Sequence, residues 1–272
     1  MSTFTTPVNC IENGTKFIES TLLLTAHLKS FNLDETEETL KSSDDILSVL
    51  QTFPKLSKDS NMYDNIVKYI DNSQLNENVV VKLLNIYEIN NLNVKTDSQP
   101  NKNSNRMLLW HGAPASKIAS IIQNGLKKPD GGGEQRFGPG IYFADRVGKS
   151  SKYCCATRNE SPNPGDKGFL LLCEVDVGTP YEIVTERLVF NTPPETFDCV
   201  KVIGKKVPDP DENVNFMGIC IPLGKTVEVD NDDGFTPPLC YNEYVVYSQQ
   251  KARVLYVVEF QFTLPPILNL AM

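Results

Sequence analysis

Cysteine pairs of the C-x-x-C type are missing from this sequence, and histidine is scarce. None of the seven cysteines belongs to a C-x-x-C pair, and the only histidines are His27 and His111. Because a structural zinc site needs four such ligands at short spacings, no zinc finger can be assembled from them. Scattered thiols are typical of reduced cysteines packed as small apolar groups in an intracellular protein. The sequence therefore predicts no metal site.

Long basic runs and long apolar runs are also absent. The formal net charge is −8, and the positive residues occur singly or in pairs such as Lys127-Lys128. Without a basic stripe, direct binding to DNA is not expected. No apolar run approaches the ~18 residues of a membrane helix, and the leucine cluster at residues 22–24 lacks the flanks of a signal peptide. We expect a protein of the nucleus, the cytoplasm or both, with no membrane partner.

The glycine fingerprint of dinucleotide-binding folds is a third absence. The glycine run at residues 131–133 is followed by Glu134, Gln135 and Arg136, and no strand pattern precedes it. A Rossmann fold instead uses G-x-G-x-x-G directly after a strand to hold its cofactor. A doubly wound domain that carries a nicotinamide cofactor is therefore not expected.

The pattern that is present predicts one main domain with a small helical piece before it. With 272 residues, 40% of them hydrophobic, the chain can bury a core. Apolar residues at three- and four-residue spacings predict an amphipathic helix over residues 15–29. The acidic stretch 32–45 is typical of a solvated helix face or linker, and the polar stretch 90–105 of a surface loop.

Beyond residue 105 the pattern changes from helical to mixed. Helices are predicted over residues 114–124, ending at Gly125, and from Arg146 to about Thr157. Strands rich in Val, Tyr and Phe are predicted at residues 107–110, 140–143, 169–177, 244–247 and 254–262. Because these strands do not alternate with long helices, we expect an α+β fold built on antiparallel sheet.

Three segments carry residues that an ordinary core does not need. They are LLWHG at 108–112, GPGIYFAD at 138–145 and LCYNEYVVY at 239–247. His111 stands where a strand opens into a loop, which is where sites are built. Glu243 lies inside an aromatic, β-branched strand, where a carboxylate is costly unless it is partnered or used. The alternative for Glu243 is an outward-facing residue of an edge strand.

Together these segments resemble the signature of the poly(ADP-ribose) polymerase family, whose diphtheria-toxin-like members carry a histidine, a tyrosine and a glutamate on separate strands. The matching residues here are His111, Tyr142 and Glu243, with KSSKYC at residues 149–154 between the second and the third. The resemblance covers roughly residues 49–262. It implies an ADP-ribosyltransferase fold of packed antiparallel sheets with flanking helices, preceded by a short helical segment.

The resemblance also implies a domain organisation. We expect a helical or linker segment over residues 1–48, the catalytic domain over residues 49–264 and a tail over residues 265–272. The chain is most similar to the nuclear, DNA-dependent type of the family. The zinc fingers, the Trp-Gly-Arg domain and the full helical domain of that type are not expected in the first 48 residues, since the only tryptophan is Trp110. An activity that does not depend on DNA breaks is the corresponding expectation.

NAD+ is the substrate that the resemblance implies, consumed in the reaction and not held as a cofactor. The backbone of Gly112 and the hydroxyl of Ser150 would bind the nicotinamide carboxamide. Tyr153 would stack on the nicotinamide ring, and Tyr142 would close its other side. His111 would hydrogen-bond the ribose on the adenine side.

Glu243 would stabilise the oxocarbenium-like ribose and polarise the incoming hydroxyl. In this family a glutamate at that position accompanies chain elongation, and Tyr241, Cys240 and Lys149 match the acceptor side. Protein acceptors modified on Glu, Asp or Ser side chains are the implied partners. The alternatives are an enzyme that adds a single ADP-ribose and an inactive domain that binds NAD+ or ADP-ribose. A toxin-type arginine transferase is disfavoured, because the E-x-E match at residues 35–37 lies far from Glu243.

Several positions depart from the family pattern. Ala113 and Lys117 stand where Ser or Thr and Asn are usual, which alters the contacts expected on the adenosine side. The loop over residues 127–136 is short. Arg136 and Cys240 replace apolar residues on the acceptor side, so acceptor affinity and chain length are expected to differ.

Overall fold

The computed structural model describes residues 43–75, 79–89, 105–129, 135–154, 162–184, 188–229 and 236–265. The helix predicted over residues 15–29, most of the two polar stretches and nearly all of the predicted tail lie outside these ranges.

The first half of the described chain contains α2 (Ser43–Leu50), α3 (Asn61–Asn72), β1 (Val80–Glu88), β2 (Arg106–Gly112), α4 (Ala115–Asn124), β3 (Ile141–Phe143) and α5 (Val147–Ser151). The second half contains β4 (Lys167–Asp176), β5 (Pro180–Ile183), β6 (Cys199–Val202), β7 (Gly204–Pro208), η2 (Pro210–Glu212), β8 (Val214–Phe216), β9 (Ile219–Ile221), β10 (Thr226–Glu228), β11 (Leu239–Tyr241), β12 (Glu243–Val246), η3 (Gln249–Lys251) and β13 (Ala252–Thr263).

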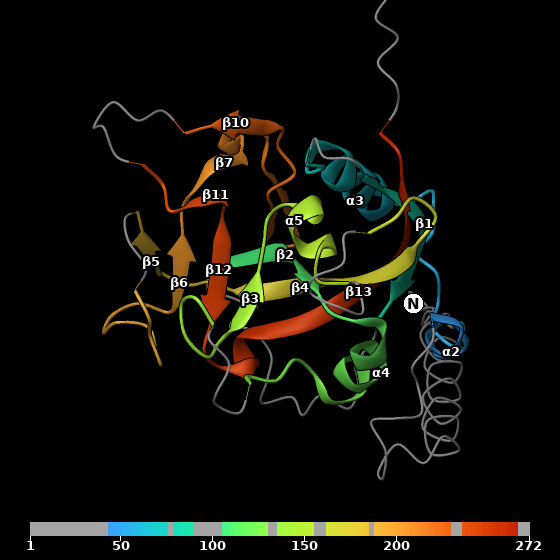
Figure 1. Cartoon of the computed structure of the whole chain (residues 1–272), viewed down its shortest axis with the longest axis horizontal. Coiled ribbons are helices and arrows are strands. Elements are labelled where there is room, and N and C mark those ends of the chain that lie inside the picture. The colour runs from blue at the N-terminus through green and yellow to red at the C-terminus, as the bar shows by residue number, and fades with distance from the viewer. Residues whose placement is uncertain are drawn as a thin grey trace, which may run out of the picture.

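A six-stranded sheet in the order β1-β13-β4-β2-β9-β8 forms the centre of the fold (Figure 1). Strand β4 is buried from its second residue to its last, so both of its faces are covered. Leu171 and Cys173 belong to the same apolar cluster as helices α2 and α4. Leu170 and Leu172 belong to the cluster that contains helix α3. Because side chains alternate along a strand, these helices cover opposite faces of the sheet.

The helices begin and end where their sequences specify. At the start of α3 the Ser60 hydroxyl accepts the Tyr63 N–H at 3.2 Å, which satisfies one of the unpaired donors of the first turn. The helix predicted at residues 114–124 is confirmed as α4, with Ile118 and Ile122 buried. It ends at Gly125, whose φ of +75° favours glycine. None of the helices described here is long and apolar enough to cross a membrane.

Two smaller sheets lie beside the central one. Their strand orders are β3-β12-β6-β5 and β10-β7-β11. The α+β class is confirmed, although each of the three sheets contains one parallel pair, β2 with β9, β7 with β11 and β5 with β6. The chain passes from β11 to β12 through the single residue Asn242, so one segment joins the two smaller sheets.

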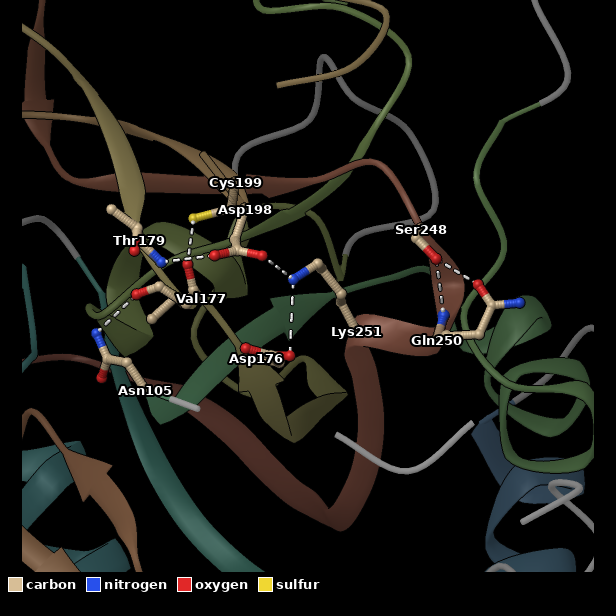
Figure 2. A network of polar contacts seen from close by, with 10 residues as sticks. Asn105, Asp176, Val177, Thr179, Asp198, Cys199, Ser248, Gln250 and Lys251 are labelled. Atoms are coloured by element: carbon tan, nitrogen blue, oxygen red, sulfur yellow. Dashed lines mark hydrogen bonds and ion pairs between the residues drawn. The ribbon is translucent and has the colours of Figure 1, made fainter. Parts of the chain in front are cut away.

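A polar network fastens the ends of β4, β5 and β6 to the start of β13 (Figure 2). The Lys251 ammonium lies 2.9 Å from an Asp198 carboxylate oxygen and 3.6 Å from one of Asp176. The other Asp198 oxygen accepts the Thr179 N–H at 2.9 Å. These bonds and Lys251 lower the pKa of Asp198, so the carboxylate form is the one stabilised by folding.

The helix predicted from Arg146 to about Thr157 is wrong in its length. Helix α5 ends at Ser151, and the N–H groups of Tyr153 and Cys154 bond carbonyls only three residues back. This turn places the buried Cys154 thiol where it donates to the Phe169 carbonyl of β4 at 3.1 Å. Residues 155–157 lie outside the described part of the chain.

Candidate active site

The central sheet and the four-stranded sheet meet between β2 and the residue after β3. Trp110 and Ala144 exchange two backbone hydrogen bonds of 2.8 and 2.9 Å there. This contact brings His111 beside β3, with Nδ1 2.7 Å from the Tyr142 carbonyl oxygen. Because a carbonyl only accepts, we assign the proton to Nδ1, which leaves Nε2 as the acceptor of the neutral ring. Burial lowers the pKa of His111 from its ordinary value, although the bond to Tyr142 opposes this, so the neutral imidazole is favoured.

The side chain of Tyr142 is held by the loop that precedes β3. Its hydroxyl donates to the Gly138 carbonyl at 2.7 Å and accepts the Phe137 N–H at 3.1 Å. Gly138 has a φ of +98°, and a Cβ there would overlap the Phe190 carbonyl. Only glycine fits this turn, which explains why it precedes the strand that carries Tyr142.

Gly112, Ser150 and Tyr153 come together at the end of β2. A Cβ on Gly112 would overlap the Ser150 carbonyl oxygen and would lie 3.0 Å from the Tyr153 Cβ, so helix α5 packs directly on the Gly112 backbone. The buried Ser150 hydroxyl donates to the Trp110 carbonyl at 3.1 Å, and its oxygen keeps the capacity to accept. The Tyr153 ring is 50% exposed. A half-exposed aromatic ring therefore stands beside a partly buried strand end.

Glu243 begins β12 in the interior of the four-stranded sheet, and its carboxylate is paired. An oxygen of Glu243 lies 3.0 Å from the Lys149 ammonium, and each side chain is 14% exposed. The same ammonium donates to the backbone carbonyls of Tyr241 and Asn242 at 2.9 and 3.2 Å. Burial lowers the pKa of Lys149, whereas Glu243 and Asp145 oppose that shift. The alternative in which Glu243 is an outward residue of an edge strand is wrong, because β12 pairs with β3 on one side and β6 on the other.

Helix α5 connects these two groups of residues. Lys149 reaches Glu243 on β12, and the next residue, Ser150, contacts Gly112 and the Trp110 carbonyl on β2. On the sheet side, Tyr142 of β3 lies opposite Val245 of β12. The site residues predicted from three separate segments of the sequence thus lie around helix α5 and the paired strands β3 and β12.

The predicted acceptor-side residues lie on and around β11. Cys240 is exposed on this strand, and Tyr241 is half-buried next to it. The Arg136 guanidinium donates to the Pro238 carbonyl at 3.2 Å, just before β11, and lies 5.5 Å from the centre of the Phe137 ring. Arg136 therefore adds positive charge beside the strand that leads to Glu243.

No three His, Cys, Asp or Glu side chains in the described ranges cluster in a way that could hold a metal ion. The charged cluster that does occur was not recognised from the sequence. Asp145 is fully buried, and one of its oxygens accepts the Asn242 side-chain amide at 2.7 Å and the Tyr244 hydroxyl at 3.3 Å. Burial raises the pKa of Asp145, and Arg146 and Asn242 oppose the shift. An aspartate two residues after an apolar strand was the available signal, because a carboxylate there needs a partner if it is buried.

Comparison with known proteins places this arrangement in a family. The family model of the poly(ADP-ribose) polymerase catalytic domain matches residues 60–262. Poly [ADP-ribose] polymerase 2 of Arabidopsis thaliana is 32% identical over 218 residues, which are 76% of this chain and 32% of that protein. Poly [ADP-ribose] polymerase 1 of Danio rerio is 35% identical over 163 residues, 58% of this chain and 15% of that protein. The chain thus spans about a third or less of the length of these relatives. The family model matches residues 60–262, a range that lies inside the catalytic domain predicted at residues 49–264. The boundaries at 49 and 264 themselves remain a prediction.

Proposed function

Because the chain belongs to the poly(ADP-ribose) polymerase catalytic-domain family, we propose that it is an NAD+ ADP-ribosyltransferase. It would release nicotinamide from NAD+ and transfer ADP-ribose to protein acceptors. The observation that carries the proposal is the position of helix α5 between Gly112 and Glu243. Ser150 of this helix packs against Gly112, which is predicted to bind nicotinamide. The preceding residue, Lys149, pairs with the Glu243 carboxylate.

The NAD+ site would use the residues grouped at the end of β2. Because Gly112 has no side chain, α5 packs directly on its backbone and brings Ser150 beside it, and the Ser150 hydroxyl oxygen keeps acceptor capacity for a carboxamide. The half-exposed Tyr153 ring offers a stacking surface. Tyr142 would close the other side of the nicotinamide ring. The neutral His111 ring, with Nε2 as acceptor, suits a bond from a ribose hydroxyl.

Glu243 would act at the ribose. As the bond from ribose to nicotinamide breaks, the electron pair leaves with nicotinamide and positive charge develops on the sugar, which a carboxylate stabilises. An acceptor oxygen then bonds to the anomeric carbon. Where the acceptor is a hydroxyl, Glu243 would polarise it and its proton would pass to the carboxylate or to water as the C–O bond forms. Lys149 holds Glu243 at 3.0 Å and so sets the direction of the carboxylate.

We further propose that the transferred unit is elongated into poly(ADP-ribose). The glutamate at the third position supports elongation, since it can polarise the ribose hydroxyl of a unit already attached, with Tyr241, Cys240 and Lys149 on the acceptor side. Single transfer, and an inactive domain that binds NAD+ or ADP-ribose, are the competing functions.

The test is incubation of the purified chain with labelled NAD+, without DNA, followed by a denaturing gel. Glu243→Gln is run beside it, with Glu228→Gln as the control because Glu228 is exposed on β10. A high-molecular-weight smear from the wild type and the control, absent from Glu243→Gln, is the expected result. Discrete bands from the wild type would mean single transfer. No incorporation, even after nicked DNA is added, would overturn the proposed activity in favour of a binding domain.

A further inference from the structure

The two residues that flank Glu243 point at the same atom. The Asn242 amide donates to Oδ2 of Asp145 at 2.7 Å, and the Tyr244 hydroxyl donates to the same oxygen at 3.3 Å. Successive side chains of an extended chain point to opposite sides. When residues 242 and 244 are both turned toward Asp145, Glu243 is turned away from it. One buried carboxylate thus sets the direction of the residue between its two donors.

The bond from Asn242 to Asp145 lies at a point where the backbone is not held by a continuous strand ladder. Asn242 lies between β11 and β12, which belong to different sheets, so no single ladder holds both sides of this residue. Its side chain supplies the missing contacts, because its carbonyl accepts the Gly204 N–H at 2.9 Å while its amide donates to Asp145. A Cβ on Gly204 would overlap the backbone of Tyr241. The joint is therefore closely packed on the β7 side and hydrogen-bonded on the Asp145 side.

Asp145 is itself held in place by its neighbours along the chain. Arg146 is fully buried and donates to the carbonyls of Asn72 and Gly224, each at 3.1 Å. These bonds tie the residue after Asp145 to the end of α3 and to the segment before β10. Four residues after Asp145, Lys149 contacts Glu243 directly, at 3.0 Å. The segment 145–149 thus contacts the segment 241–244 in two places, through Asp145 and through Lys149.

We propose that Asp145 is a positioning residue for Glu243, acting through Asn242 and Tyr244. The role depends on the proposed function for its effect on catalysis, but the geometric part stands without it. Asp145 is not among the residues proposed to bind nicotinamide. Loss of the contact is therefore expected to lower kcat and to leave the KM for NAD+ unchanged.

The structure contains a natural control for this arrangement. Asn85 and Tyr87, also two residues apart, both donate to one oxygen of buried Glu259, at 2.6 and 3.1 Å. The residue between them is the apolar Ile86 of β1. Tyr244→Phe and Tyr87→Phe therefore each remove one hydroxyl from a buried carboxylate, but only the first lies beside Glu243.

The central experiment is a charge swap between positions 145 and 242. Asn242→Asp sets two carboxylates against each other, and the double variant Asp145→Asn with Asn242→Asp restores an amide facing a carboxylate. In nicotinamide-release assays we expect Asn242→Asp to lower kcat by about tenfold or more, with KM within about twofold, and the double variant to recover most of the loss. Tyr244→Phe should lower kcat by about threefold, and Tyr87→Phe should leave it unchanged.

Three results would overturn the positioning role: no recovery in a folded double variant, equal losses in the two Tyr→Phe variants, or a rise in KM without a fall in kcat. If Asn242→Asp does not fold, the paired Tyr→Phe variants decide the question alone. If the wild type releases no nicotinamide, the proposed function fails, and crystal structures of the wild type and Tyr244→Phe then test the geometry. The separation of Glu243 from Lys149, 3.0 Å here, should increase in the variant. An unchanged separation would reject the role.

Discussion

The Lys149 ammonium and the Glu243 carboxylate lie 3.0 Å apart, and neither side chain is more than 14% exposed. The ammonium also bonds the two backbone carbonyls that precede Glu243. One cation thus serves both the side chain and the main chain of the strand on which the proposed chemistry depends. A charge removed from such a site leaves its partners without a donor.

Replacing Lys149 with Met should therefore impair both turnover and stability. We expect kcat for nicotinamide release to fall by about tenfold or more, and the free energy of unfolding to fall by about 1–3 kcal/mol, because a mostly buried carboxylate loses its partner. Lys201→Met is the matched control, since Lys201 pairs with Glu182, which is 50% exposed. Steady-state assays and urea unfolding of both variants measure the two effects. Full activity of Lys149→Met would show that Glu243 needs no cation.

Gly112→Ala should weaken the binding of NAD+. A Cβ at this position would overlap the Ser150 carbonyl, so α5 has to move. The KM for NAD+ is expected to rise by about tenfold or more. Gly125→Ala is the comparison, because its Cβ meets nothing within 4 Å and only its φ of +75° is unfavourable. That variant should lose some stability and keep its KM, and equal KM values in the two variants would contradict the prediction.

His111 should make the fold less stable in mild acid. Burial lowers its pKa below the ordinary value of 6.5, so the unfolded chain takes up a proton that the native chain refuses. Proton uptake then favours unfolding, and stability falls as the pH drops below about 6.5, by at most about 1.4 kcal/mol per pH unit. Urea unfolding between pH 7.5 and 5 should show a steeper decline for the wild type than for His111→Asn. Parallel declines would mean that His111 titrates normally.

The network around Lys251 should matter for stability alone. Lys251→Met removes the ion pairs to Asp198 and Asp176, and a loss of only about 1 kcal/mol in the free energy of unfolding is expected, because both pairs are partly exposed (Figure 2). Lys206→Met, which removes an exposed pair of 3.8 Å with Glu228, should cost less. Nicotinamide release should be unchanged in both variants. A fall in kcat for Lys251→Met would connect this network to the site.

Length did not by itself decide which elements could be predicted, since the three-residue β3 was predicted and the nine-residue β1 was not. Helix α4 and strands β4 and β13 carry enough residues for their apolar periods to show. The strands β8, β9 and β10 have three residues each, too few for any period, and none of them was predicted. The helix after Arg146 was overestimated because its apolar and small residues continue past the point at which the Cys154 thiol bonds β4.

The residues of the candidate site could be named, but their contacts could not. His111, Tyr142 and Glu243 stand in recognisable motifs, whereas the pairing of Lys149 with Glu243 depends on the packing of α5 between distant strands. Asp145 belongs to the GPGIYFAD motif, but no role could be predicted for it, since its partners Asn242 and Tyr244 are about a hundred residues away. Contacts of that kind follow from topology and not from local pattern.

The register of β12 has a consequence for how this region tolerates mutation. Val245 lies opposite Tyr142 on one side, and Glu243 lies opposite Val202 on the other. A slip of one residue in a strand turns every following side chain to the other face. A single residue inserted into or deleted from β12 would therefore change the register of Glu243 relative to Val245, so that the two could not both keep their present faces, whereas most replacements would only loosen the packing. This strand can accept changes of residue and cannot accept changes of length.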